Sequence, residues 1–143
     1  MTRKEKLFVR SARVARLATA GADGRPHVIP ICFAFDGKKI YSPIDEKPKK
    51  TSPLRLKRIR NIRANPHVAL VIDRYHEDWK KLAYLLIAGR ARILVSGAGH
   101  RRAVRLLKKK YRQYRVMRLE ERPVIVIAPS RVTTWDGVGD AAY

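Results

Sequence analysis

Residues 13–45 read RVARLATAGADGRPHVIPICFAFDGKKIYSPID, and this stretch decides the fold class. It holds three β-rich runs, at 14–20, 26–35 and 39–44, separated by Gly/Asp-containing turns at 21–24 and 36–37. Glycine and aspartate tolerate the backbone angles of tight hairpin turns. The stretch therefore predicts three antiparallel strands in a meander, with Pro30 marking an edge or a bulge in the second strand.

The rest of the chain alternates between helical and extended patterns. Residues 3–13 predict a short basic helix, and Ser52-Pro53 predicts the capped start of a second one, which Asn65-Pro66 ends. A narrow apolar stripe predicts a longer helix at 100–118. Three further runs read as strands, at 67–73, 82–95 and 124–135. Gly89 in the second of these runs is the predicted site of a β-bulge.

Six strands, mostly antiparallel, and two substantial helices predict a mainly β fold, a β-barrel with helices. The length of 143 residues suits one domain over 1–143. The longest apolar run, 82–88, is too short to span a bilayer, so no membrane association is expected. The single cysteine, Cys32, cannot form an internal disulfide, which favours a cytoplasmic location, and its strand position predicts a small buried hydrophobe.

The charge is unusual, because 33 Lys+Arg face 12 Asp+Glu, for a net charge of +21. Such a field attracts phosphates, whether on a small ligand or on a polyanion, so non-specific polyanion binding is expected. Just over half of the basic residues fall in two stretches that lack acids, 47–63 and 101–118. One interpretation is therefore a basic nucleic-acid-binding module, although aromatic residues are not interleaved with these charges as in single-strand binders.

The familiar catalytic motifs are missing from the sequence. The four histidines are scattered without metal-ligand spacing, Gly97-Ala98-Gly99 is not followed by the Gly-Lys-Ser/Thr of a P-loop, and no serine sits in a nucleophile elbow. We expect no metal site and no catalytic side chain of the protein's own. If the protein is an enzyme, a bound cofactor would carry the chemistry.

One constellation does indicate a binding site for a phosphate. Ser42 and Pro43 end the third predicted strand, and Lys57 and Arg58 stand near the start of the second helix. A helix N-terminus offers free amide groups and a favourable dipole to an anion, Ser42 and Thr51 offer hydroxyls, and arginine can bind two phosphate oxygens at once.

These elements resemble the pyridoxamine-phosphate-oxidase-like split barrels over most of the chain. The resemblance rests on residues 13–45, on the basic helix that ends RNIRANPHVAL, and on Glu77-Asp78-Trp79. With the segment 45–49 (DEKPK), it is most similar to the branch of deazaflavin (coenzyme F420)-dependent oxidoreductases. The resemblance implies a six-stranded antiparallel split β-barrel of the FMN-binding type, a homodimer, and F420 or FMN bound at the dimer interface.

The resemblance also implies roles for individual residues. Lys57 and Arg58 match the family's phosphate-binding pair, Ser42 matches its hydroxyl residue, and the loop of Trp79 approaches the partner subunit's cofactor. The edge segment whose backbone faces the flavin ring corresponds to His27, Val28, Ile29 and Pro30. Lys50 lies among lysines that would suit the polyglutamate tail of F420.

The chain departs from true pyridoxamine-phosphate oxidases, because no Arg and Lys bracket the second strand and the chain ends soon after Trp135. Vitamin B6 oxidation is therefore not expected. The leading hypothesis is a flavin- or deazaflavin-dependent oxidoreductase that transfers hydride to or from a small molecule which the sequence does not identify. The alternatives are the nucleic-acid-binding module and a protein that binds or stores the cofactor without turnover.

Overall fold

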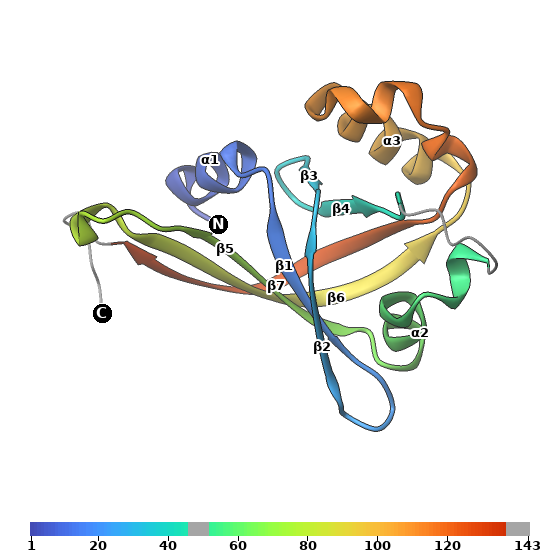
Figure 1. Cartoon of the computed structure of the whole chain (residues 1–143), viewed down its shortest axis with the longest axis horizontal. Coiled ribbons are helices and arrows are strands. Elements are labelled where there is room, and N and C mark those ends of the chain that lie inside the picture. Colours follow the sequence, from blue (N-terminus) through green and yellow to red (C-terminus); the bar gives the residue numbers. More distant parts are fainter. Residues whose placement is uncertain (46–51, 137–143) are drawn as a thin grey trace.

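Seven antiparallel strands form one curled sheet in the computed structural model, which describes residues 1–45 and 52–136 (Figure 1). The sheet runs in the order β2-β1-β5-β6-β7-β4-β3. The strands are β1 (Ala15–Ala20), β2 (Pro26–Ile31), β3 (Ala34–Phe35), β4 (Ile40–Pro43), β5 (His67–Arg74), β6 (Ala83–Leu94) and β7 (Val124–Asp136). The predicted mainly β split barrel is confirmed, with seven strands in place of six.

The extra strand arises because the predicted run 26–35 is interrupted at Cys32-Phe33. Phe33 is fully buried, and its N–H donates to the Tyr111 hydroxyl (3.0 Å) instead of to a neighbouring strand. Side-chain capture of a buried backbone donor satisfies it as a ladder bond would. Two short strands, β2 and β3, therefore replace the one that was expected.

The predicted three-stranded meander is wrong. β2 pairs with β1 and β3 pairs with β4, but β2 and β3 stand at opposite ends of the strand order. β4 pairs on its other side with β7, from the far end of the chain. The segment Cys32-Phe33 thus crosses from one edge of the curled sheet to the other, and Pro30 lies on an edge strand as predicted.

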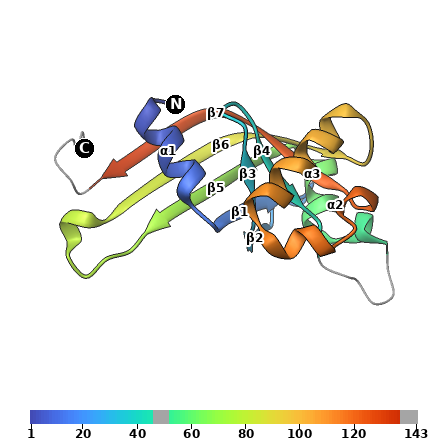
Figure 2. The same ribbon diagram turned by 90° about the horizontal axis from the view of Figure 1, so that it is seen from above.

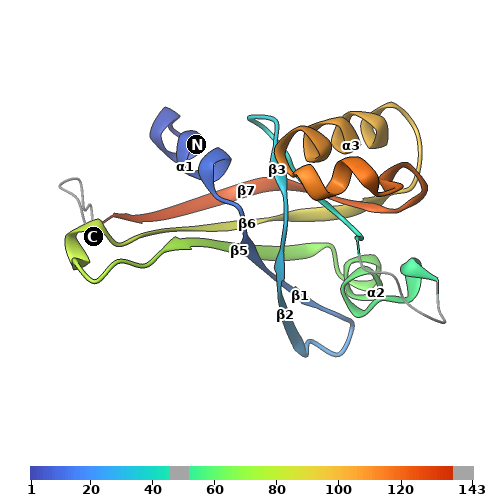
Figure 3. The ribbon, with the colours of Figure 1, turned by 45° about the horizontal axis from the view of Figure 1, so that its top comes forward.

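Two of the three described helices lie at one end of the long strands, and the third lies between the two ends (Figure 1). The helices are α1 (Arg3–Ser11), α2 (Lys57–Ala64) and α3 (Ala98–Lys110), joined by the short 3-10 turns η1 (Pro53–Arg55), η2 (Trp79–Lys81), η3 (Arg112–Val116) and η4 (Leu119–Glu121). α2 and α3 lie at one end of the long strands β5–β7, and the β5–β6 connection lies at the other (Figures 1 and 3). Seen from above, α1 lies over the strands between these two ends (Figure 2).

Two helix boundaries differ from the prediction. Ser52 caps η1, and extended backbone at Leu56 delays the start of α2 to Lys57. The helix expected at 100–118 ends at Lys110, where Tyr111 adopts an extended conformation. That conformation allows the Tyr111 hydroxyl to reach the backbone of Phe33 and Arg13.

The core has two parts. Side chains from the barrel strands fill its interior around Leu17, Leu70 and Ile87, and a second cluster lies beneath α3 around Leu107, Tyr114 and Val126. The predicted bulge at Gly89 is confirmed by a register shift between Ala88 and Gly89 against β7. A Cβ at Gly89 would lie 2.6 Å from the Ala128 carbonyl oxygen, so this position requires glycine.

Candidate functional site

A cleft of about 230 Å³ brings together four of the residues predicted to bind a ligand, namely Pro30, Ser42, Pro43 and Arg58. We call it the β2–α2 cleft, and its remaining walls are Val14, Ile31, Cys32 and Asp45. The four predicted residues come from β2, β4 and α2, so the curl of the sheet, and not proximity in sequence, assembles the cleft.

Arg58 supplies the positive charge of the cleft. It lies in the first turn of α2 and is 6% exposed, whereas the neighbouring Lys57 is exposed to solvent and does not line the cleft. Adjacent residues of a helix point about 100° apart, so the two side chains cannot both face one narrow cleft. Leu56 precedes α2 and offers no side-chain hydrogen bond to its first turn, and an anion placed there would meet the positive end of the helix dipole.

Ser42 is buried, and its hydroxyl donates to the Cys32 carbonyl oxygen (2.9 Å). This bond ties β4 to the segment that crosses the sheet edges. The Ser42 oxygen can still accept a bond, but to donate to a phosphate it must release Cys32. Ser42 thus shapes the cleft wall in this structure.

Side-chain exposure alternates along the predicted edge segment, residues 27–30 of β2. Val28 and Pro30 are exposed, while His27 and Ile29 are half-buried. The outer edge of β2 has no strand partner among the described residues, so its backbone is open to a ligand. His27 Nδ1 is buried and has no hydrogen-bond partner within residues 1–45 and 52–136.

The other predicted residues are not in the cleft of this chain. Trp79 begins η2, is 70% exposed, and lies at the end of the long strands opposite α2 (Figure 1). It can therefore meet a β2–α2 cleft only on a second molecule. Lys50 and Thr51 fall outside the described residues.

Sequence reasoning missed Asp45 and misjudged Cys32. Tyr114 donates to Asp45 Oδ2 (2.5 Å), and Arg122 donates to the Asp45 backbone oxygen (2.6 Å), so the carboxylate is held in the cleft wall. The signal for Asp45 was an acid directly after a buried strand, where the chain leaves the sheet. Cys32 lies between strands and is half-buried at the cleft, which corrects its assignment to a strand interior.

Residues at the end of α3 form hydrogen bonds that hold the crossing segment Cys32-Phe33 in place. The Tyr111 hydroxyl lies 2.7 Å from the Arg13 carbonyl oxygen and 2.9 Å from that of Phe33, and Lys110 donates to the Ala12 carbonyl oxygen (2.6 Å). Burial raises the pKa of Tyr111 to about 12, and burial together with the nearby Arg13 lowers the pKa of Lys110 to about 8. Burial and the bond to Asp45 raise the pKa of Tyr114, so this phenol stays protonated.

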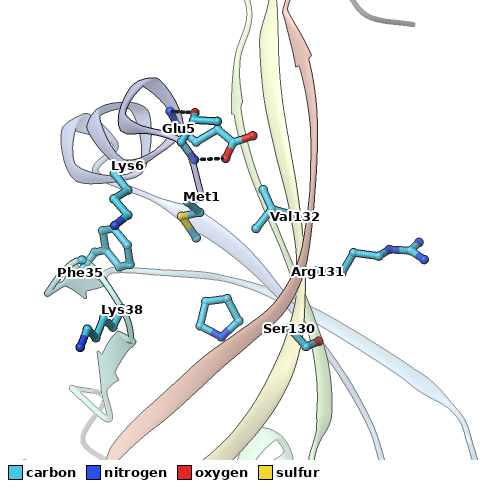
Figure 4. A pocket seen from close by; sticks show the side chains of 11 residues that line it. Met1, Glu5, Lys6, Phe35, Lys38, Ser130, Arg131 and Val132 are labelled. Carbon is cyan, nitrogen blue, oxygen red and sulfur yellow. Dashed lines mark hydrogen bonds between the residues drawn. The ribbon is translucent and has the colours of Figure 1, made fainter.

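A larger cavity, of about 620 Å³, lies between α1, the β3–β4 turn and β7 (Figure 4). Its one carboxylate, Glu5, is already bound to Thr2 in a capping box and to Thr134, and the Arg131 side chain points away from it. None of the residues predicted to bind a ligand lines it. The β2–α2 cleft is therefore the better candidate site.

The chemistry available in the β2–α2 cleft is that of anion binding. A buried guanidinium, uncapped helix amides and an open strand edge all offer donors. No group of three or more His, Cys, Asp or Glu within the described residues could hold a metal ion. The described helices are also too short or too polar to cross a membrane.

Comparison with known proteins agrees with this geometry. The sequence pattern of the pyridoxamine 5'-phosphate oxidase family matches residues 1–136. A 5a,11a-dehydrotetracycline/5a,11a-dehydrooxytetracycline reductase of Streptomyces rimosus is 30% identical over 140 residues, which are 97% of this chain and 85% of the relative.

Solved structures show the same fold. A conserved hypothetical protein of Mycobacterium tuberculosis superposes with a TM-score of 0.76 at 24% identity, covering 96% of this chain and 86% of that one. A structure titled F420 reductase superposes with a TM-score of 0.64 at 22% identity, covering 90% and 94%. From the family pattern, the curled sheet and the β2–α2 cleft together, we conclude that this chain belongs to the pyridoxamine 5'-phosphate oxidase family of split barrels.

Proposed function

We propose that the protein is an oxidoreductase that binds F420 or FMN, with the cofactor's phosphate in the β2–α2 cleft, and transfers hydride between that cofactor and a small molecule. One observation carries the proposal: Arg58 is buried in the wall of the cleft that also contains Ser42 and Pro30. A guanidinium has five N–H donors, and its planar fork matches two phosphate oxygens at once, so Arg58 can hold a ligand phosphate in addition to its contacts within the chain.

The relatives support a redox role. The Streptomyces rimosus relative is named a reductase, and one of the structures that share the fold is titled F420 reductase. The described side chains of the cleft offer no nucleophile paired with a base, so bound F420 or FMN would supply the hydride chemistry. The protein itself would bind the cofactor, orient it and exclude water from it.

The size of the cleft limits what it holds. Ligand pockets that enclose a whole small molecule are about 300–1,000 Å³, and the cleft has about 230 Å³. We therefore assign the cleft to the phosphate end and the open edge of β2, from His27 to Pro30, to the ring. Val28 and Pro30, which are exposed, would form an apolar floor under it.

A ring on an edge strand needs a second wall to exclude water, and we propose that a second copy of the chain provides it. Trp79 is exposed at the far end of the long strands, where it could reach the partner's β2 edge in a two-fold dimer. We further propose that Lys57, which precedes Arg58 and is exposed to solvent, attracts the anionic part of the cofactor toward the cleft. Light scattering that finds a monomer at micromolar concentration would contradict this arrangement.

The test compares two arginines of the same helix. Arg58→Gln should weaken F420 or FMN binding about 10- to 100-fold, because a hydrogen bond to a charged group contributes about 1.5–3 kcal/mol. Arg60→Gln removes the same charge from an exposed position of α2 and should change affinity less than threefold. Binding is measured by the visible absorption and fluorescence of the added cofactor, and folding by the melting temperature of each variant.

Equal affinities for the two variants would sink the assignment of Arg58. Because Arg58 is buried, Arg58→Lys provides a milder second variant, which keeps the charge but not the two-point geometry, and it should show an intermediate loss. A protein that binds cofactor through Arg58 yet never oxidises or reduces it with any acceptor would be a binding or storage protein.

A further inference from the structure

The outer face of α3 carries a dense positive charge that the cofactor function does not use. Arg101, Arg105 and Lys109 of this helix are exposed, as is Arg112, the first residue of η3, while Val104, Leu107 and Tyr111 turn inward to the core. At 100° per residue Arg101, Arg105 and Lys109 fall within one arc of the helix, opposite the buried stripe. We call Arg101, Arg105, Lys109 and Arg112 the α3 face.

Few carboxylates neutralise this side of the molecule. Asp36 pairs with Arg102 (3.4 Å), Glu120 with Lys108 (2.5 Å) and Glu121 with Arg118 (3.7 Å). Among the described residues, none of the four members of the α3 face has an ion pair. No carboxylate of the described residues therefore offsets the charge of the face.

Folding gains nothing from this arrangement. Arg101, Arg105 and Lys109 are spaced four apart, and like charges at that spacing repel on a helix. The first turn of α3 contains no acid but holds Arg101, where the helix dipole disfavours a positive charge. A polyanionic partner would relieve both costs.

We propose that the α3 face binds the phosphate backbone of double-stranded DNA, independently of the sequence of the bases. Arginine predominates in the face, and its planar fork suits phosphate oxygens. The aromatic residues of this region, Tyr111 and Tyr114, are buried beneath the helix, so no stacking platform for single strands is presented. The three helical residues of the face span roughly 12 Å along the helix axis, enough to contact more than one phosphate.

Duplex DNA fits this surface better than a membrane does. Membrane-bound helices add several large apolar anchors to their basic residues. Here Val116 is the one exposed large hydrophobic residue in 98–118, a region that lies wholly within the described residues. Since α3 lies on the opposite side of β4 from α2, the inference does not depend on the cofactor proposal (Figure 1).

The test measures the affinity of the full-length protein for a fluorescent DNA duplex of mixed sequence at several salt concentrations. Four phosphate contacts predict a slope of about −3.6 in log K against log salt, which is roughly a 100-fold loss of affinity between about 50 and 200 mM salt. The quadruple variant Arg101→Gln, Arg105→Gln, Lys109→Gln, Arg112→Gln should lose at least tenfold in affinity at low salt. Its slope should become shallower by about 3 to 4.

A matched control removes the same number of charges elsewhere. Arg3→Gln, Arg25→Gln, Lys81→Gln and Arg131→Gln change four exposed residues and give the same net charge. This control should keep the wild-type slope. Equal losses in both variants would show attraction to net charge alone and overturn the proposal.

The membrane alternative is tested with vesicles of phosphatidylcholine and phosphatidylserine. If the α3-face variant lost vesicle binding but kept its DNA affinity, the proposal would be overturned in favour of a lipid surface. The melting temperature of each variant shows whether it is folded. That of the α3-face variant should not fall, because the substitutions remove like-charge repulsion.

Discussion

The two basic stretches of the chain contribute α2 and α3, which lie beside the same barrel yet place their charge in opposite ways. α2 turns Arg58 into the β2–α2 cleft, where it is 6% exposed, while α3 presents its arginines to solvent. A buried guanidinium selects a ligand by shape and by hydrogen-bond geometry. An exposed ridge selects only by charge and loses its attraction in salt. Composition alone does not distinguish these two uses.

The largest further effect on stability is expected at Tyr111, which connects the end of α3 to the segment beside the β2–α2 cleft. Tyr111→Phe removes the hydroxyl that bonds Phe33 and Arg13, and it leaves the buried Phe33 N–H without a partner. We expect a loss of about 1–3 kcal/mol in the free energy of unfolding, measured by urea denaturation. Tyr75→Phe, at an exposed site, should change stability little.

Tyr111→Phe also tests whether α3 and the β2–α2 cleft are coupled. If cofactor affinity also falls, the inner side of α3 positions the cleft wall at Cys32, and the two regions are coupled. If stability falls while affinity is unchanged, the two regions are independent.

A smaller effect comes from Lys110, at the end of α3. Its pKa is lowered to about 8 in the folded chain, against about 10.4 in an unfolded one. Between these values the unfolded chain binds more protons, so the free energy of unfolding should rise with pH. The group remains partly solvated, which limits the gain to the order of 1 kcal/mol.

Urea midpoints from about pH 7.5 to 9.5 should therefore increase for the wild type relative to Lys110→Met, which keeps the packing on Phe33. The pH range stops at about 9.5 because Tyr111, whose pKa is raised to about 12 in the folded chain, reverses the trend at higher pH. Above pH 10 the folded chain retains a proton that the unfolded chain has lost, and stability falls again. Parallel curves for the two proteins would contradict the assigned role of Lys110.

The smallest effect is expected at Lys57, which precedes Arg58 in sequence but faces solvent. Lys57→Gln should weaken cofactor binding about two- to threefold, and raised salt should remove that difference, because exposed ion pairs contribute about 0.2–1 kcal/mol. A loss as large as that of Arg58→Gln would mean that the phosphate lies outside the cleft. Isothermal titration at low and high salt measures both.

Local features of the fold were predictable wherever one residue type limits the backbone. Pro30 cannot donate a ladder bond and lies on an edge strand, and Gly89 forms the bulge where a side chain would strike Ala128. The turn at Asp36-Gly37 connects β3 and β4 as expected, with Gly37 at a φ of 99°. Each of these follows from sterics or hydrogen bonding within a few residues.

The pairing of distant segments was not predictable in the same way. Hydrophobic alternation indicated that 39–44 was a strand, but nothing local indicated that β4 would pair with β7 across most of the chain. The same holds for Asp45, whose place in the cleft depends on Tyr114 and Arg122 from beyond α3. Contacts of this kind are decided by how the curled sheet closes.

The sequence by itself thus determined a basic, mainly β chain with a dense cluster of positive charge around Lys57 and Arg58, because charge, periodicity and turn residues are local properties. Only the tertiary structure decided that Arg58 enters the cleft while Lys57 does not, and that Trp79 lies at the opposite end of the molecule. The physical reason is that the direction of a side chain depends on helix phase and on which surface the helix packs against. Those are settled when the apolar faces of strands and helices are buried together.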